Sequence, residues 1–309
     1  MAELLRLSVS PHIHSKRSTS GIMLDVIIAL VPAAVAGTVI FGLRSLLIIA
    51  ACIASCVIFE AGFNKITGKE QTVGDLSAVV TGLLLALNLP AAIPIWQSVI
   101  GSAFAIIIVK CLFGGIGCNL VNPAITARVF MIVSFGSMAV QSFPKGVDVV
   151  SGATPLASIA NGEMPDMLDL FLGNTGGTVG ETCALALLIG FVYLLVRRII
   201  SWHIPVSFIG SVFILSLFME GFDAARALAL VLSGGLLIGA IFMATDYVTS
   251  PTTPSGKLIY GIGAGIFTFL IRYFGIYPEG VSFAILLMNI LNPYIESLTP
   301  RKIFGGKAA

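Results

Sequence analysis

The stretch Asn119-Leu120-Val121-Asn122-Pro123, which recurs as Asn289-Ile290-Leu291-Asn292-Pro293, decides how this chain is expected to fold. Each copy follows an interrupted apolar segment: Leu87-Asn88-Leu89-Pro90 ends one, and the run from Thr245 to Pro254 ends the other. Irregular backbone is tolerated at bilayer depth where protein or a cavity surrounds it, so paired interruptions are typical of transporter-like folds built from two repeats. We therefore predict two related halves with broken helices.

The remainder of the chain is strongly apolar. Of its 309 residues, 57% are hydrophobic and 10% are charged. Soluble domains carry roughly 25% charged residues, so this chain cannot cover itself with a water-compatible surface. Long apolar segments separated by polar ones indicate an all-α integral membrane protein rather than a β-barrel. We expect contact with membrane lipid and no nucleic-acid partner.

Ten apolar segments are candidate membrane spans. Seven approach the roughly 20 residues that a helix needs to cross a bilayer, at 22–42, 45–61, 94–113, 181–199, 205–220, 227–243 and 258–275. Three are shorter or more polar, at 77–89, 123–140 and 280–296. Five helices per half require the second half to be inverted relative to the first. The sequence thus predicts about ten transmembrane helices in two inverted five-helix repeats.

Lysine and arginine placement predicts the orientation. With the N-terminus inside, the inner segments hold Arg6, Lys16, Arg17, Lys65, Lys69, Lys110, Arg197, Arg198, Lys257, Arg301, Lys302 and Lys307. The outer segments hold Arg44, Lys145, Arg226 and Arg272. This asymmetry follows the positive-inside rule and puts both termini in the cytoplasm. The expected organisation is a cytoplasmic segment 1–21, a membrane repeat 22–140, an outward-facing loop 141–180, a second repeat 181–296 and a cytoplasmic tail 297–309.

Few side chains suggest catalysis or metal binding. The five cysteines form no CxxC pattern and have no neighbouring histidine, which fits small buried apolar residues better than a metal site or a disulfide. We expect no catalytic residue and no metal ligands in this chain. Arg128, Asp25 and Asp246 are ionisable residues in or near the bilayer and are functional candidates because burial is costly. For the two aspartates, a salt bridge or a helix cap explains them equally well.

The long polar loop contains Ser151-Gly152-Ala153-Thr154 directly before Pro155. Proline disfavours the helical region for the preceding residue, so Thr154 is predicted to have an extended backbone and an accessible hydroxyl. The run resembles the acceptor sequence for covalent FMN, in which the threonine oxygen is esterified to the flavin phosphate. The alternative is a turn of small residues with no chemistry.

Further stretches resemble the D subunit of the Rnf ion-translocating electron-transport complexes and, more distantly, the B subunit of the sodium-pumping NADH:quinone reductase. The matching residues are FGGIGCNLVNPA (113–124), VSGATPLA (150–157), FLGNTGGTVGETCAL (171–185), WHIP (202–205) and FMATDYVTSPTTPSG (242–256). The resemblance implies covalent FMN on Thr154 and a noncovalent riboflavin near Asn119 and Asn122. Asparagine amides can donate to and accept from a flavin edge, or they can satisfy backbone groups at a broken helix end.

The function implied by this resemblance is that of a flavin-carrying subunit of an ion-translocating oxidoreductase in a bacterial or archaeal cytoplasmic membrane. Such a subunit is not catalytic alone. It relays electrons between the ferredoxin or NADH side and outer-face redox centres, next to partner subunits that hold flavins and iron–sulfur clusters. The transported ion, Na⁺ or H⁺, is left open. The alternatives are a stand-alone channel or secondary transporter, and a structural anchor for other subunits.

Overall fold

A computed structural model describes residues 18–139, 142–144, 154–275 and 280–300. Most of the predicted N-terminal segment and C-terminal tail, together with Ser151, Gly152 and Ala153, lie outside the described residues. The described part is helical, and its β-structure is limited to an isolated bridge between Ser142 and Gly177.

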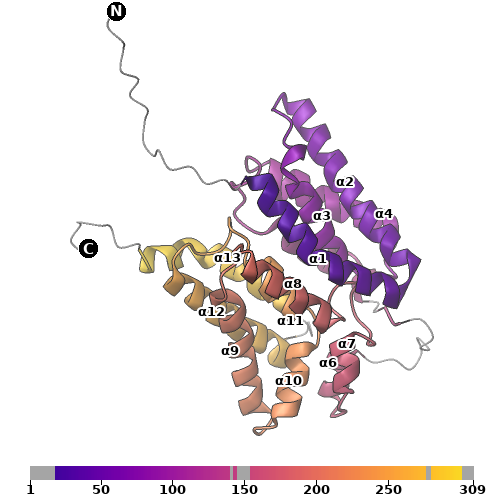
Figure 1. The fold of residues 1–309 in the computed structure, drawn as a ribbon, viewed down its shortest axis with the longest axis vertical. Coiled ribbons are helices and arrows are strands. Elements are labelled where there is room, and N and C mark those ends of the chain that lie inside the picture. The colour runs from indigo at the N-terminus through magenta and orange to yellow at the C-terminus, as the bar shows by residue number, and fades with distance from the viewer. Residues whose placement is uncertain (1–17, 140–141, 145–153, 276–279, 301–309) are drawn as a thin grey trace, which may run out of the picture.

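The first half comprises five apolar helical segments (Figure 1). They are α1 (Thr19–Phe41), α2 (Leu43–Thr67), α3 (Ser77–Leu87), α4 (Ile95–Ala103) and α5 (Pro123–Ser134). The helix α4 continues directly as the π-helix η2 (Phe104–Cys111). The short 3-10 turns η1 (Val73–Asp75) and η3 (Gly136–Ala139) flank this group.

Two short helices, α6 (Pro155–Ala160) and α7 (Met167–Leu172), lie in the predicted loop and precede the second half. The second half contains α8 (Ala184–Val196), α9 (His203–Met219), α10 (Ala224–Leu232), α11 (Leu236–Ile238), α12 (Pro254–Phe274) and α13 (Val281–Leu298). The helix α11 runs into a second π-helix, η4 (Gly239–Met243).

Each of the ten predicted apolar segments contains a helix, but these helices differ greatly in length. Within the described residues, α1, α2, α12 and α13 are long and apolar enough to cross a membrane. The pair α10 and α11–η4, bent by 67° at its break, can count as a fifth span. The others are shorter apolar helices. The chain is therefore an all-α, multi-pass membrane protein, and the predicted number of ten spans goes beyond what helix length establishes.

The two Asn-x-x-Asn-Pro motifs occupy different local structures. Asn122 caps α5 and Pro123 is its first residue, whereas Pro293 lies inside α13. The closer local counterpart of Asn122-Pro123 is Thr253-Pro254, which caps and opens α12 in the same way. Both of these helices follow a π-helix and a loop. The recurrence in the sequence is real, but its copies do not have equivalent roles.

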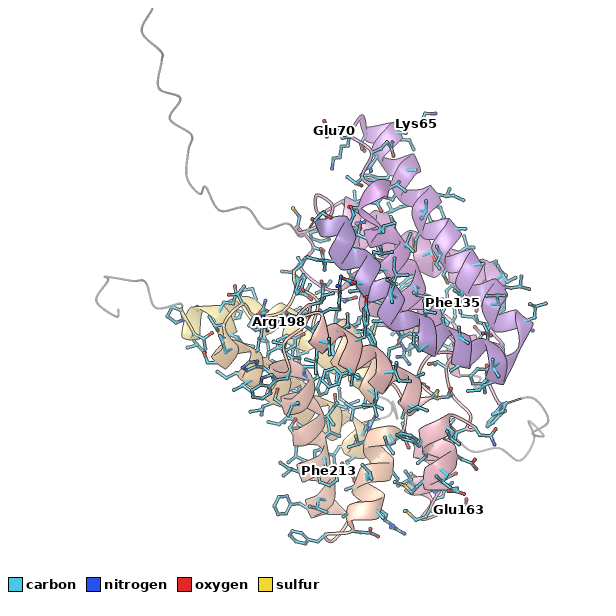
Figure 2. All side chains as sticks on the ribbon, in the orientation of Figure 1. Lys65, Glu70, Phe135, Glu163, Arg198 and Phe213 are labelled. Carbon is cyan, nitrogen blue, oxygen red and sulfur yellow. The ribbon has the colours of Figure 1, made fainter. Side chains whose placement is uncertain are left out.

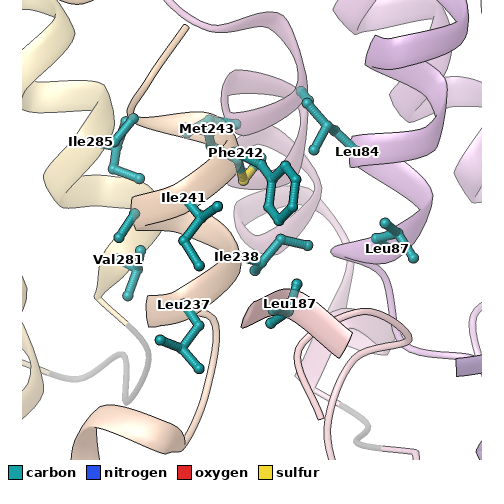
Figure 3. Packing of buried hydrophobic residues seen from close by; sticks show 14 of the residues in the cluster. Leu84, Leu87, Leu187, Leu237, Ile238, Ile241, Phe242, Met243, Val281 and Ile285 are labelled. Carbon is teal, nitrogen blue, oxygen red and sulfur yellow. The ribbon is translucent and has the colours of Figure 1, made fainter. Parts of the chain in front are cut away.

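The main hydrophobic core joins the two halves. Figure 3 shows Phe242 of η4 between Leu84 of α3 and Ile285 of α13, all within one buried cluster. Helix α8 packs along α1 at the same boundary. In Figure 2, Lys65 and Glu70 lie at one end of the molecule and Glu163 at the opposite end. Lys65, predicted to face the cytoplasm, is thus far from Glu163 of the predicted outer loop, whereas Arg198, also predicted to face the cytoplasm, lies near the middle of this view.

Helices α9 and α12 approach each other closely at Gly261 and Gly265, a GxxxG pair of the kind that permits close packing of membrane helices. A Cβ atom on Gly265 would lie 2.9 Å from the Phe208 carbonyl oxygen, and one on Gly261 would lie 2.9 Å from the Ile204 carbonyl oxygen. The Ser207 and Ser211 hydroxyls lie closer still, and the carbonyl oxygens belong to the backbone of α9, so a side chain at either glycine would push the helices apart.

We expect Gly265→Ala to destabilise the protein by about 1–3 kcal/mol through overpacking, seen as a lower unfolding midpoint in detergent micelles. Gly210→Ala is the matched control, because a Cβ there meets no atom within 4 Å. Equal midpoints for both variants would contradict close packing at Gly265.

Candidate functional site

Thr154 lies at the start of α6 with an extended backbone, at φ −67° and ψ 153°. This confirms the conformation predicted from Pro155. The Thr154 hydroxyl oxygen accepts a hydrogen bond from the Ala157 backbone N–H at 3.3 Å and so caps the helix. The side chain is half-buried rather than fully exposed.

The C-terminal part of the predicted loop enters the helix bundle. The Gly180 N–H donates to the Leu87 carbonyl at 2.8 Å, and the Val179 N–H donates to the Leu89 carbonyl at 3.1 Å. These carbonyls follow the end of α3, where helical hydrogen bonding stops among fully buried residues. The loop segment therefore satisfies backbone acceptors that would otherwise be unpaired.

Arg128 of α5 is buried behind this segment, with 2% of its surface exposed. Its Nη1 donates to the Asn88 Oδ1 at 2.5 Å, and its Nη2 lies 3.7 Å from a carboxylate oxygen of Glu181. The other carboxylate oxygen of Glu181 accepts from the Thr178 N–H at 2.9 Å. Arg128 thus links the end of α3 to the inserted loop segment, through a hydrogen bond to Asn88 and an ion pair with Glu181.

A second buried ion pair joins α2 to the π-helix η2. Lys110 Nζ donates to both Glu60 carboxylate oxygens at 2.8 Å and to Ser77 Oγ at 2.6 Å. Thr72 donates to Glu60 at 2.6 Å. With all three ammonium protons engaged, the charge pair is fully hydrogen-bonded on the lysine side.

Sequence reasoning did not single out Glu60, Lys110, Glu181 or Asn88 as site residues, and it counted Lys110 among the inner-flank cations. A signal for the first two was present, because both fall within predicted apolar spans, where charged residues are expensive. The pairing between them could not be read from a sequence separation of 50 residues.

A cavity of about 110 Å³ lies where the two halves meet. Its lining combines apolar residues of α1, α3 and α8 with polar ones, among them Ser77, Lys110, Asn119, Asn122, Thr245 and Asp246. It is smaller than the roughly 300–1,000 Å³ of typical ligand clefts. Both π-helices border it, and π-helical turns are frequent at functional sites.

Asn119 and Asn122, predicted as cofactor-binding residues, both line this cavity. The Asn122 Oδ1 accepts from the N–H groups of Ala124 and Ile125 at 3.0 and 3.3 Å, and its amide donates to the Met243 carbonyl at 3.3 Å. The Asn119 amide donates to the Val121 carbonyl at 3.1 Å. Asn122 is thus committed to backbone groups on both sides, whereas Asn119 has spare hydrogen-bonding capacity on its oxygen.

The other two ionisable candidates, Asp25 and Asp246, have hydrogen-bonding or ionic partners as well. Asp25 of α1 pairs with Arg197 at 3.1 Å and accepts from the Tyr193 hydroxyl at 2.8 Å. Asp246 lies in the loop between η4 and α12, where its carboxylate accepts from Thr249 at 3.2 Å. Burial raises the pKa of the Asp246 carboxyl above its usual range. Within this cavity, Asp246 therefore holds a proton more readily than an exposed aspartate does.

Within the described part of the chain, no group of three metal-ligating side chains is present. The arrangement places the Thr154 hydroxyl at the start of α6 and a cavity with a partly polar lining between the two halves.

The sequence model of the NQR2, RnfD, RnfE family matches residues 6–305 of the chain. The D subunit of the Na(+)-translocating ferredoxin:NAD(+) oxidoreductase complex of Acetobacterium woodii is 48% identical, over 97% of this chain and 95% of its own length. The D subunit of the proton-translocating ferredoxin:NAD(+) oxidoreductase complex of Clostridium ljungdahlii is 40% identical, over 98% and 96% of the two chains. The D subunit of the ion-translocating oxidoreductase complex of Marinobacter nauticus is 38% identical, over 96% and 94%.

Replacing Glu60 by Gln should destabilise the protein by about 3–5 kcal/mol, because the Lys110 charge stays buried without its counter-ion. Chemical unfolding in detergent micelles measures the loss. The double variant Glu60→Leu with Lys110→Met should lose much less, since no buried charge remains.

Arg197→Gln serves as the matched control. It removes an ion pair of similar length whose arginine is 57% exposed, and exposed pairs contribute about 0–1 kcal/mol. An equal effect of Glu60→Gln and Arg197→Gln would show that burial does not govern the Glu60–Lys110 pair.

Proposed function

This chain belongs to the NQR2, RnfD, RnfE family, and we propose on that basis that it is a membrane subunit of an ion-translocating oxidoreductase complex. The observation that carries the proposal is the near full-length match to the D subunits of ferredoxin:NAD(+) oxidoreductase complexes. Those two relatives are named for Na⁺ and for proton translocation, so the names leave the ion coupled to this chain undecided.

The proposed arrangement is ten spans in two inverted repeats within a cytoplasmic membrane, with both termini inside and residues 141–180 outside. The helix in each predicted segment supports this proposal. Lys65 and Glu163 lie at opposite ends of the molecule in Figure 2, which supports their proposed placement on opposite sides of the membrane. Partner subunits bearing flavins and iron–sulfur clusters would complete the electron path.

Thr154 is proposed to carry FMN through its side-chain oxygen, in the motif completed by Ser151, Gly152 and Ala153. Its extended backbone and its half-buried hydroxyl at the start of α6 support this role. The flavin would supply one-electron transfer when bound. The chain itself would position the hydroxyl: Pro155 restrains the backbone next to it, and the Ala157 N–H orients its oxygen.

A noncovalent riboflavin is proposed for the cavity beside Asn119 and Asn122. The mixed polar and apolar lining supports a planar, partly apolar ligand with a hydrogen-bonding edge. The small volume means that side chains would have to move to admit it. Asn119 is the better candidate ligand of the two, because Asn122 already caps α5.

A stand-alone transporter is the competing function, and the bent α10–α11 span is the observation that favours it. Relatives named as complex subunits over nearly their whole length make the redox subunit the stronger proposal.

Replacing Thr154 by Asn should abolish flavin fluorescence of the denatured polypeptide band, because asparagine has no hydroxyl to esterify. Asparagine is also a good helix N-cap, so α6 keeps its cap, which Thr154→Ala would lose at about 0.5–2 kcal/mol. Thr154→Ser should retain partial labelling. Ser158→Ala, a hydroxyl deletion in the same helix, is the control and should label fully. Undiminished fluorescence of Thr154→Asn would falsify the attachment site.

Asn119→Leu should lower the riboflavin extracted by acid from the purified complex, while the Thr154-linked flavin is unchanged. Each lost hydrogen-bonding partner costs about 1–3 kcal/mol, or roughly a five- to 150-fold weaker site. Asn122→Asp, which keeps the α5 cap acceptor, tests the second amide without removing the cap. Parental riboflavin content in both variants would mean that these asparagines serve the fold alone.

A further inference from the structure

The break between α10 and α11 lies against the helix that begins after Thr154. A Cβ atom on Gly234 would lie 2.8 Å from Leu156 Cδ1, so the glycine leaves room that the leucine side chain fills. Gly234 also has φ +68°, a conformation that other residues adopt at a cost. Both the backbone turn and the close contact therefore require glycine at this position.

The break is fixed from its other sides. Arg272 of α12 donates to the Leu230 carbonyl at 2.7 Å and to the Ser233 carbonyl at 3.1 Å, where α10 ends. A Cβ on the next residue, Gly235, would lie 3.1 Å from Arg128 Nη1 and 3.3 Å from a Glu181 oxygen. Arg272 thus fixes the end of α10, and Arg128 and Glu181 lie close to Gly235, next to the space that the Leu156 side chain occupies.

Helix α6 is also anchored by contacts other than that between Leu156 and Gly234. Its Ile159 joins Leu170 of α7 and Leu230 of α10 in a small buried cluster that Leu156 packs against. Beyond its C-terminal end, Arg226 donates to the Gly162 carbonyl at 3.2 Å. These contacts set where α6 lies. The contact made by Leu156 is closer along the chain to Thr154 than those made by Ile159 and Gly162.

Only the buried Pro155 separates Leu156 from Thr154. The proline ring restrains its own backbone, and Thr154 is bonded to the first turn of α6 through Ala157. With little rotational freedom between the two residues, a displacement of the Leu156 side chain is passed on to the Thr154 oxygen.

We propose that Leu156 is a positioning residue for the flavin on Thr154, seated in the space that Gly234 leaves at the break between α10 and α11. This inference rests on the proposed role of Thr154. The break of a membrane span then sets the location of the redox group, so the two move together.

The first test measures residue 154 without any flavin. Thr154→Cys, in the full chain with Cys118 and Cys183 replaced by Ser, is labelled with a nitroxide, and its mobility is read from the electron paramagnetic resonance line shape. Adding Leu156→Ala should mobilise the label, because the first turn of α6 loses its seat. Leu156→Met, which nearly conserves the volume, should restore the parental line shape. An unchanged line shape with Leu156→Ala overturns the proposal.

Gly234→Ala should mobilise the label as well, since its Cβ displaces Leu156. Gly221→Ala is the matched control: its φ of +66° imposes the same backbone strain, but a Cβ there meets no atom within 4 Å. Equal label mobility in the two glycine variants would mean that filling the space at Gly234 has no effect of its own, and would overturn the proposal.

The second test uses the flavin itself on the full chain, with Thr154→Asn as the blank. Leu156→Ala should keep the covalent flavin but raise its iodide quenching constant roughly twofold through greater mobility, and Leu168→Ala, 68% exposed on α7, should not. Absence of any Thr154-dependent flavin from the parental chain would refute the proposed function. The nitroxide result would still decide whether Leu156, packed against Gly234, positions residue 154. A parental quenching constant in Leu156→Ala would refute the positioning role of Leu156 and leave the flavin attachment at Thr154 unaffected.

Discussion

The fold depends on how helix ends are satisfied inside an apolar bundle. The carbonyls of Leu87 and Leu89 are buried where α3 stops, and the Gly180 and Val179 N–H groups supply their partners. In lipid, each unsatisfied backbone group would cost several kcal/mol. Helix α1 also packs closely against this loop segment, since a Cβ on Gly37 of α1 would lie 2.2 Å from the Val179 carbonyl oxygen. The end of the loop between the two halves is therefore part of the buried core of the helix bundle.

The buried charges follow from the same constraint. Arg128 and Glu181 stand behind the inserted segment, and Glu60 and Lys110 bridge α2 to a π-helix. Buried ion pairs seldom add net stability over apolar residues, but losing one partner is severely destabilising. We infer that these pairs specify which helices meet. The Arg128–Glu181 pair lies where the end of α3, the loop segment and the α10–α11 break come together.

The two proposed cofactor positions depend in different ways on how the helices pack. The cavity takes its lining from both halves, so its shape depends on their packing. Thr154 lies on a short helix that is docked onto the α10–α11 break through Leu156 and Gly234. In the proposed arrangement, a change at the break would therefore reach Thr154 through Leu156.

Sequence alone determined the helical membrane class, the ten apolar segments, the interruptions after α3 and η4, the GxxxG contact and the extended Thr154. These are local or periodic features, so hydropathy and proline stereochemistry are enough to predict them. The tertiary structure alone decided that Asn122 caps α5 while Asn292 lies within α13, and that Arg128 meets Glu181. It also decided that Gly234 receives Leu156, because contacts across 53 and 78 residues have no local signal.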